Sequence, residues 1–389
     1  MKEILLAFNK GSATLKVAAY ALGELGAPRF QLTLDMASRQ VDGRGQVPEE
    51  LQAFDPDQDI TDIVALIACH AAGPDGHLVA MAHRIVHGGH RQAPEWITDA
   101  LVNDLEDLEV MCPLQQPPAL EVLCHLRELW PEIPHLAVFD TAFHRPQPAL
   151  AATYALPASV RMQGVTAQGY HGISCQHVLR QLRARHPLQA TGRVLVAHLG
   201  HSSTMTAVHN GRSVATSMGF STLDGLPMGT RCGHLDPGVL LYLLEQGWNK
   251  SRLTDLLYHQ SGLLGLSGTS ACLRDLLASD CDSARFAVDY FCYRAARMAA
   301  SLACAMEGLE TIVFTGGIGE NLPEIRSNIC RRLAWLGVAL DDEANTAGRE
   351  VLDRPESRCR LLVVPADEAG EISLQCEPLL AHLPQTVLV

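Results

Sequence analysis

The sequence lacks several features that mark particular classes of protein. No two of its twelve cysteines form a CxxC pair or a metal-ligand spacing, and no signal peptide pattern opens the chain. We therefore expect reduced thiols in the cytoplasm rather than disulfides or a structural metal site. Acidic residues outnumber basic ones by 43 to 30, which gives a formal net charge of −13. This charge argues against nucleic acid or an anionic membrane as the main partner.

The sequence also lacks a long, uninterrupted apolar run. Its longest apolar region, residues 283 to 308, contains Asp289, Arg294 and Arg297 and is therefore better interpreted as a core helix than as a membrane span. Apolar residues make up 47% of the chain and charged residues 19%, which predicts a soluble, globular protein. A length of 389 residues favours two domains.

Two segments about 190 residues apart share one pattern. LLAFNKGSATLKVAAY and LVAHLGHSSTMTAVHN each indicate a strand, a turn of small residues and a second strand, as expected of two duplicated halves. Strand and helix patterns alternate between and after them, so the fold class is α/β. We predict an N-terminal domain over 1–150 and a C-terminal domain over 151–389, whose last helix could pack back on the first.

Two turns are candidates for phosphate binding. TGGIGEN, residues 315 to 321, lies between a buried strand and a helix start, where backbone N–H groups can approach a phosphate. The turn LGHSST of the second repeated segment has the same small-residue character, although His201 is bulky. The alternative for TGGIGEN is an ordinary tight turn between strand and helix.

HRIVHGGH, residues 83 to 90, gathers three histidines without predicting a metal site. In a strand, His83 and His87 lie on one face about 13 Å apart, too far to share one ion. Arg84 is the better functional candidate because a guanidinium suits carboxylate and phosphate oxygens, with a structural ion pair as the alternative.

Three further residues are candidates. Arg231 lies in a long loop, residues 217 to 238, whose apolar side chains favour burial over a mobile insertion. His171 stands in GYHGIS and is catalytic or simply structural. Asp140 follows a predicted strand and is a candidate for a general base, for an orienter of an arginine, or for a cap of the next turn.

Taken together, these segments resemble the acetate and propionate kinase family, within the superfamily of sugar kinases, Hsp70 and actin. The resemblance follows the chain in order through FNKGSATLK, HRIVHGG, CPLQQPPAL, FDTAFH, YHGIS, HLGHSS, the 216–233 loop, SGLLGLSG, FTGGIGEN and VVPADE. Such an ordered set is far more specific than any one motif.

The resemblance implies two duplicated ribonuclease H-like domains around a central cleft, usually in a homodimer. It implies reversible transfer of the ATP γ-phosphoryl group to acetate or another short-chain carboxylate, giving an acyl phosphate and ADP, with Mg²⁺ or Mn²⁺. Positive charge and a metal over the phosphoryl oxygens suit that chemistry. Two alternatives remain open: a different phosphoryl donor, such as pyrophosphate or phosphate, or a catalytically silent nucleotide-binding regulator.

The resemblance also assigns residues by motif position. The catalytic group is Arg84, Asp140, His171 and Arg231, and the metal would be supported by Asn9 and Glu368. The substrate pocket is expected to be lined by Val86, Leu114, Gln115, Tyr170 and Thr222. The nucleotide and phosphate group is Ser12, Thr14, Lys16, His198, Leu199, Gly200, His201, Ser202, Cys272, Arg274, Gly317, Ile318, Gly319, Glu320 and Asn321.

Several positions depart from the family pattern. Gln115 replaces a histidine, His201 and Ser202 replace Asn and Gly in the phosphate turn, and Cys272 replaces an Asp at the nucleotide. Further departures are Gln116, His90, His234 and Ala369. The catalytic charges are kept, so we expect an active but divergent kinase. The family usually has Phe and Pro where this chain has Tyr170 and Thr222. The hydroxyls that these two residues add predict tolerance for propionate or a small hydroxy acid beside acetate.

Overall fold

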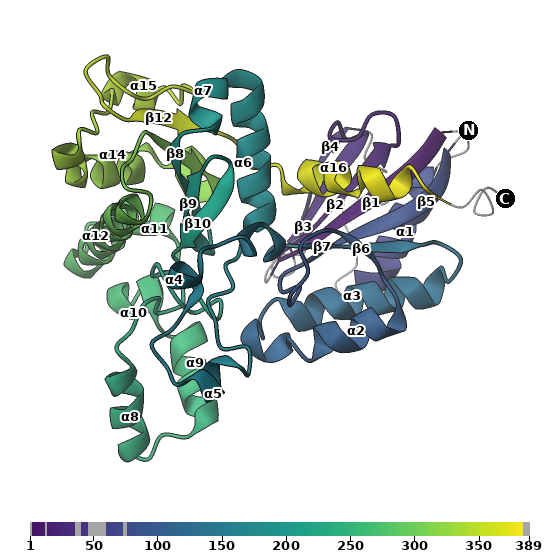
Figure 1. Ribbon diagram of the computed structural model, residues 1–389, viewed down its shortest axis with the longest axis horizontal. Helices are drawn as coiled ribbons and strands as arrows, with labels where there is room; N and C mark the ends of the chain where they lie inside the picture. The colour runs from purple at the N-terminus through teal and green to yellow at the C-terminus, as the bar shows by residue number, and fades with distance from the viewer. Residues whose placement is uncertain (1, 12–13, 36–39, 46–59, 73–75, 384–389) are drawn as a thin grey trace. The chain divides into compact units, whose positions relative to one another are not determined.

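The structure is a computed structural model that describes residues 2–11, 14–35, 40–45, 60–72 and 76–383 (Figure 1). The chain forms two compact units. Unit 1 comprises Met1–Ala142 with Asp367–Val389, and unit 2 comprises Phe143–Ala366. Among the described helices, none has the length and apolar character that a membrane crossing needs.

Unit 1 is built on a seven-stranded mixed sheet in the order β4-β3-β2-β1-β5-β7-β6. Strands β1 to β4 pair antiparallel, while β5 is parallel to both β1 and β7. The strands are β1 (Lys2–Lys10), β2 (Thr14–Ala21), β3 (Phe30–Asp35), β4 (Val41–Gly45), β5 (Gly76–Ile85), β6 (Glu95–Trp96) and β7 (His135–Phe139).

Helices cover both faces of this sheet. Ile4, Leu6 and Phe8 of β1 share a core with α1 and α3, and because side chains alternate along a strand, Asn9 faces the other way, toward α16. In Figure 1, α16 (yellow) lies across the strands, and it contacts β1, β2, β5 and β7. The helices of unit 1 are α1 (Ile60–Ala72), α2 (Asp99–Glu106), α3 (Gln116–Leu129) and α16 (Glu368–Leu380).

Unit 2 repeats the central order of strands. Its five-stranded sheet, β10-β9-β8-β11-β12, has an antiparallel hairpin with a third strand on one side and two parallel strands on the other, like β3-β2-β1-β5-β7 in unit 1. The two sheets confirm the α/β class and the duplication that the repeated hairpins predict. The strands are β8 (Arg193–Leu199), β9 (Ser203–His209), β10 (Arg212–Thr216), β11 (Thr311–Thr315) and β12 (Arg360–Val363).

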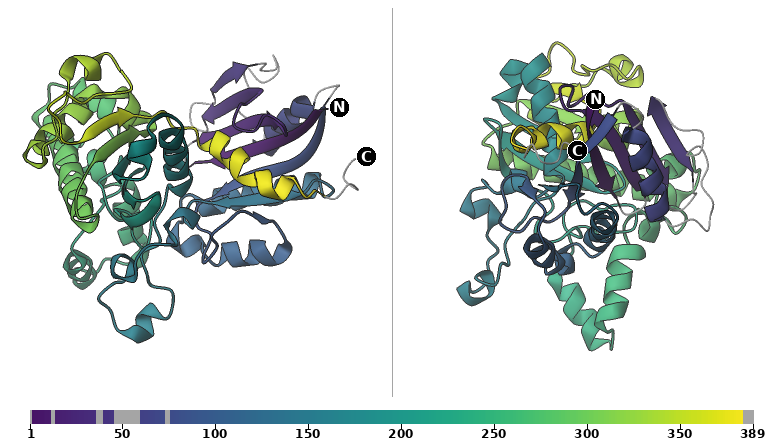
Figure 2. Two further views of the ribbon diagram at one scale, coloured as in Figure 1. Left: turned by 45° about the horizontal axis from the view of Figure 1, so that its top comes forward. Right: turned by 90° about the vertical axis from the view of Figure 1, so that its right-hand side faces the viewer.

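Helices also cover both faces of the sheet of unit 2 (Figure 2), and the side chains on both faces are buried. Val194 and Val196 of β8 pack with α6, whereas Leu195 and Ala197 pack with α12, the core helix expected over 283–308. The helices of unit 2 are α4 (Ala149–Ala152), α5 (Ala158–Arg161), α6 (Gly172–Arg185), α7 (Pro187–Ala190), α8 (Pro237–Glu245), α9 (Lys250–His259), α10 (Gly262–Ser267), α11 (Leu273–Leu277), α12 (Asp282–Ala305), α13 (Gly316–Asn321), α14 (Pro323–Arg332) and α15 (Asp342–Thr346).

Candidate active site

Arg84 and Asp140 form a buried ion pair in unit 1. Arg84 is the penultimate residue of β5 and Asp140 directly follows β7, so two neighbouring parallel strands bring them to one edge of the sheet. The Asp140 carboxylate accepts from Arg84 Nε at 2.8 Å and from Arg84 Nη2 at 2.5 Å. His83 points to the opposite face, where it stacks on Phe8. The pairing supports Asp140 as an orienter of arginine.

Asn9 and Glu368 extend this pair into a four-residue network. Asn9 Oδ1 accepts from Arg84 Nη1 at 3.2 Å, and Asn9 Nδ2 donates to Glu368 Oε2 at 2.6 Å. Burial lowers the pKa of Arg84, but the charges of Asp140 and Glu368 raise it by more, so the guanidinium stays protonated. Three of its five N–H groups serve this network, which leaves two for a ligand.

The other predicted residues of unit 1 lie at varied depth. Val86 and Gln115 are buried and Leu114 is half-buried, while Thr14 and Lys16 occupy the start of β2. Ser12 lies outside the described residues.

Gln116, which replaces an Asn of the family pattern, has a structural role. Its amide is fully buried, accepts from the backbone N–H of His87, and donates to the carbonyls of His87 and Leu105. These three hydrogen bonds hold the HGG turn that follows β5 in place.

His171 anchors a histidine pair in unit 2. It precedes α6 with a left-handed backbone (φ 57°), an uncommon conformation for a residue other than glycine. Its Nδ1 lies 3.0 Å from Thr204 Oγ1, and its ring stacks on His198 at 4.3 Å between centroids. His198 Nδ1 is in turn 2.8 Å from Ser174 Oγ. The two hydroxyls therefore fix the orientation of both rings.

Arg231 is a buried cation without a carboxylate partner among the described residues. It is 3% exposed, and it donates to the carbonyl of Thr222 at 2.8 Å and to Ser202 Oγ at 2.9 Å. Burial lowers the pKa of Arg231 to about 10, which still leaves it protonated at neutral pH. A buried cation needs a counter-charge, so this arrangement favours an anionic ligand.

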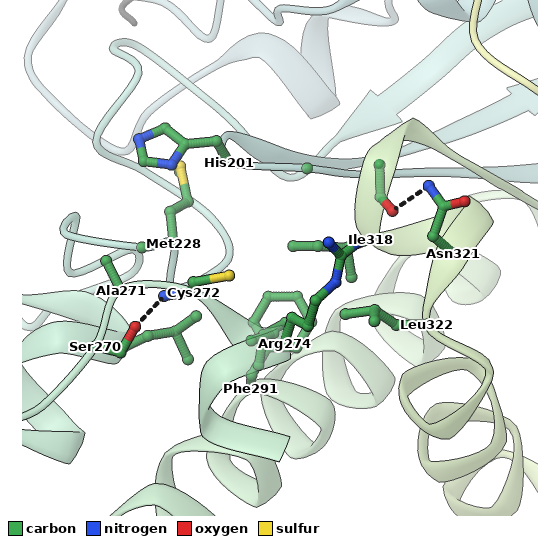
Figure 3. A pocket seen from close by; sticks show the side chains of 15 residues that line it. His201, Met228, Ser270, Ala271, Cys272, Arg274, Phe291, Ile318, Asn321 and Leu322 are labelled. Carbon is green, nitrogen blue, oxygen red and sulfur yellow. Dashed lines mark hydrogen bonds between the residues drawn. The ribbon is translucent and has the colours of Figure 1, made fainter. Parts of the chain in front are cut away.

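A pocket of about 540 Å³ lies in unit 2 beside the LGHSST turn (Figure 3). Apolar side chains, among them Leu263, Phe291 and Leu322, line much of it. Figure 3 shows Cys272 at the wall, with its backbone N–H donating to Ser270. Seven residues of the predicted nucleotide group line this pocket: Gly200, His201, Cys272, Arg274, Gly317, Ile318 and Asn321.

The remaining predicted residues of unit 2 do not line the pocket. Leu199 belongs to the apolar core, Gly319 packs near Ala197 and Phe314, and Glu320 accepts from the backbone N–H of Ala366. His198 forms a hydrogen bond with Ser174, and Ser202 accepts a hydrogen bond from Arg231.

The GGIGEN segment is a short helix, α13, where the sequence predicted a glycine turn. Gly316 has φ +78°, and a Cβ there would come within 2.7 Å of the Leu199 carbonyl, so only glycine fits. Arg326, which the sequence analysis missed, is buried and donates to the carbonyls of Gly319 and Glu320. It satisfies the carbonyls that the end of α13 leaves unpaired.

Comparison with known proteins identifies the family. The model of the acetokinase family matches residues 4–374. The chain belongs to the acetokinase family. It is 47% identical to an acetate kinase from Methylocella silvestris over 305 residues (78% of this chain, 76% of the relative) and 40% identical to one from Rhodopseudomonas palustris over 390 residues (95% and 96%).

Solved structures of the family have the same fold. A propionate kinase from Francisella tularensis superposes with a TM-score of 0.87 at 30% identity, covering 96% of this chain and 98% of that one. An acetate kinase from Porphyromonas gingivalis gives a TM-score of 0.81 at 28% identity, covering 97% and 100%. The predicted fold and family are therefore confirmed.

The predicted acyl-pocket residues of this acetokinase divide between the units, and their common role stays a prediction. Tyr170 and Thr222 are buried in unit 2. The Tyr170 hydroxyl donates to the carbonyl of Phe220 at 2.9 Å. Its proton is thus already used, which weakens the expectation of a bond from Tyr170 to a hydroxy acid.

His201 gives a pH-dependence prediction. Partial desolvation and the charge of Arg231 lower the pKa of His201 below its ordinary value, although the residue is exposed, so the ring is neutral at neutral pH without ligand. Bound phosphate oxygens favour the protonated ring, so nucleotide affinity should rise as pH falls. A histidine with an ordinary pKa of about 6.5 would show this change between about pH 6 and 8. The lowered pKa moves this change to lower pH.

His201→Asn should keep activity while flattening the pH dependence of the nucleotide KM, because asparagine donates but does not titrate. His209→Asn, in a strand outside the pocket, is the matched control. An unchanged pH profile with unchanged nucleotide affinity in His201→Asn would remove His201 from the site.

Cys272 gives a prediction about nucleotide choice. The residue is exposed at the pocket, where the family pattern has an Asp able to accept from a ribose or base. Specificity depends on such paired polar groups, so we expect kcat/KM for ATP, GTP and CTP to agree within about tenfold. Cys272→Asp should widen the differences. Tight selectivity of the wild type for ATP would contradict the prediction.

Proposed function

We propose that the chain catalyses reversible transfer of the γ-phosphoryl group of ATP to acetate or another short-chain carboxylate, giving an acyl phosphate and ADP. Family membership supports the reaction class. The observation that carries the proposal within this chain is Arg231, a buried guanidinium beside which no carboxylate of the described residues lies. Three of its N–H groups remain for the oxygens of a substrate.

The proposed reaction needs charge stabilisation more than proton transfer. A carboxylate substrate is already ionised at neutral pH, so its oxygen can attack phosphorus without a general base. Negative charge then spreads over the equatorial phosphoryl oxygens, and fixed cations stabilise it. We assign that role to the guanidinium of Arg231. To His171, whose ring is held by Thr204 and His198, we assign a hydrogen bond to the phosphoryl oxygens. Asp140 keeps Arg84 oriented for the carboxylate or the phosphoryl group.

Mg²⁺ fits the residues of unit 1. Asn9 and Glu368 offer amide and carboxylate oxygens, and Mg²⁺ is usually held by one or two carboxylates together with substrate phosphates. Among the described residues, no three His, Cys, Asp or Glu side chains gather to hold a metal ion. The ion would neutralise charge on the nucleotide phosphates.

A nucleotide is the donor that the pocket of unit 2 favours. Leu263, Phe291 and Ile318 give it an apolar wall of the kind that holds a base. Pyrophosphate or phosphate would leave that wall exposed to water. The expected homodimer belongs to the proposal as well. Leu241, Tyr242 and Leu244 of α8 are exposed, and a second copy that covered them would remove apolar surface from water.

The test is direct. Purified protein with Mg²⁺ is given acetate or propionate plus ATP, and separately acetyl phosphate plus ADP, with hydroxamate formation and nucleotide as readouts. We expect turnover in both directions. Product with pyrophosphate or phosphate but not ATP would favour the alternative donor. Nucleotide binding without any turnover would favour the silent regulator, and light scattering tests the dimer.

A further inference from the structure

Ser202 holds the buried arginine of unit 2. The Nη2 of Arg231 donates to Ser202 Oγ at 2.9 Å, and its Nη1 donates to the carbonyl of Thr222 at 2.8 Å. One hydrogen bond would let the guanidinium plane pivot, whereas two from different segments fix it. A glycine at 202, as in the family pattern, has no side-chain oxygen and could not make this contact. The contact is therefore a property of this sequence.

Ser202 also touches the wall of the nucleotide pocket. Its hydroxyl lies 3.6 Å from Met228 Sδ, and Met228 lines the pocket together with Gly200 and His201 of the same turn. Figure 3 shows Met228 and His201 on one side of the pocket. Ser202 thus stands between Arg231 and the wall against which a nucleotide would lie.

We propose that Ser202 is a positioning residue for Arg231. Its hydroxyl fixes the guanidinium beside the phosphate turn, so that the remaining N–H groups point where the transferred phosphoryl group and the carboxylate meet. The inference rests on the proposed function, in which Arg231 contacts those groups. Preorganised donors stabilise a transition state better than mobile ones because they need no reorganisation during the reaction.

The test uses three substitutions in the full chain. Ser202→Ala and Ser202→Gly remove the acceptor and should lower kcat/KM for the carboxylate about tenfold, the usual scale for a hydrogen bond to a charged group. The KM for ATP should stay within about twofold, because Ser202 itself does not line the pocket. Ser202→Thr keeps a hydroxyl and should recover most of the activity.

Ser357→Ala is the matched control. Ser357 is also a half-buried serine of unit 2 with a hydrogen-bonded hydroxyl, which donates to the Cys359 carbonyl at 2.7 Å. We expect wild-type kinetics from it. Thermal unfolding of every variant shows whether an effect on activity comes from lost folding.

Two results would overturn the inference. One is wild-type kcat/KM for the carboxylate in Ser202→Ala. The other is an equal loss for carboxylate and nucleotide that Ser202→Thr does not restore, which would mean general damage to the turn. Failure of the proposed function is distinguishable, since the wild type would then form no acyl phosphate. Calorimetry with inorganic phosphate still decides the positioning role: weaker binding by Ser202→Ala supports it, and unchanged binding refutes it.

Discussion

Arg231→Ala is expected to lower turnover at least about 100-fold in both directions, because the loss of one preorganised donor at the developing charge has that effect in other enzymes. Little stability should be lost with it. Arg231 has no carboxylate partner among the described residues, so its removal leaves no buried anion behind. Steady-state kinetics with acetate and ATP, beside thermal unfolding, measure both quantities.

Arg252→Ala is the control for this prediction. Arg252 is an exposed arginine of the same unit, and it stacks on the ring of Trp248 at 3.6 Å. It should keep full activity. Wild-type turnover in Arg231→Ala would show that Arg231 is not part of the site. The proposed function would then lose the observation on which it depends.

Arg84→Ala is expected to damage both activity and stability. Asp140 is fully buried, and without Arg84 its carboxylate loses the cation that compensates its burial. Breaking such a pair costs about 3–5 kcal/mol. Denaturant unfolding should therefore show a large loss of stability in Arg84→Ala and a small one in Arg231→Ala, while both variants lose orders of magnitude in turnover.

The double variant Arg84→Ala with Asp140→Ala separates the two effects. Removal of both charges should restore part of the stability that the single variant loses, and none of the activity. If Arg84→Ala were as stable as wild type, the ion pair would contribute little to folding. If its turnover were also normal, Arg84 would have no part in the reaction.

Much of the fold could be predicted because it follows from local periodicity. The repeated hairpins predicted the duplicated sheets, and the strand ending at Phe139 placed Asp140 at a sheet edge. The prediction of a turn at GGIGEN was wrong, because glycines favour a turn over a helix on propensity alone. In the structure they form a short helix whose last carbonyls are paired by the buried Arg326, a tertiary contact that the sequence of the motif does not contain.

The sequence predicted the site residues that lie in recognisable motifs. It did not predict the contacts that form where separate segments meet. Seven predicted residues line the pocket of unit 2, yet Met228, Leu263 and Phe291, which come from three other segments, were not predicted as site residues. The partners of the predicted side chains were missed for the same reason. Thr204, which contacts His171, and Ser202, which contacts Arg231, are recognisable only once the strands are paired.

The course of the chain through unit 1 has a consequence for its synthesis. The unit begins with β1 and is completed only by α16, which packs on β1, β2, β5 and β7 after all of unit 2 has been made. Because a ribosome delivers the chain from its N-terminus, the α16 face of the first sheet waits uncovered until Glu368–Leu380 emerges. Glu368, the partner of Asn9, arrives with that helix. The four-residue network of Arg84 can therefore be completed only after unit 2 has been synthesised.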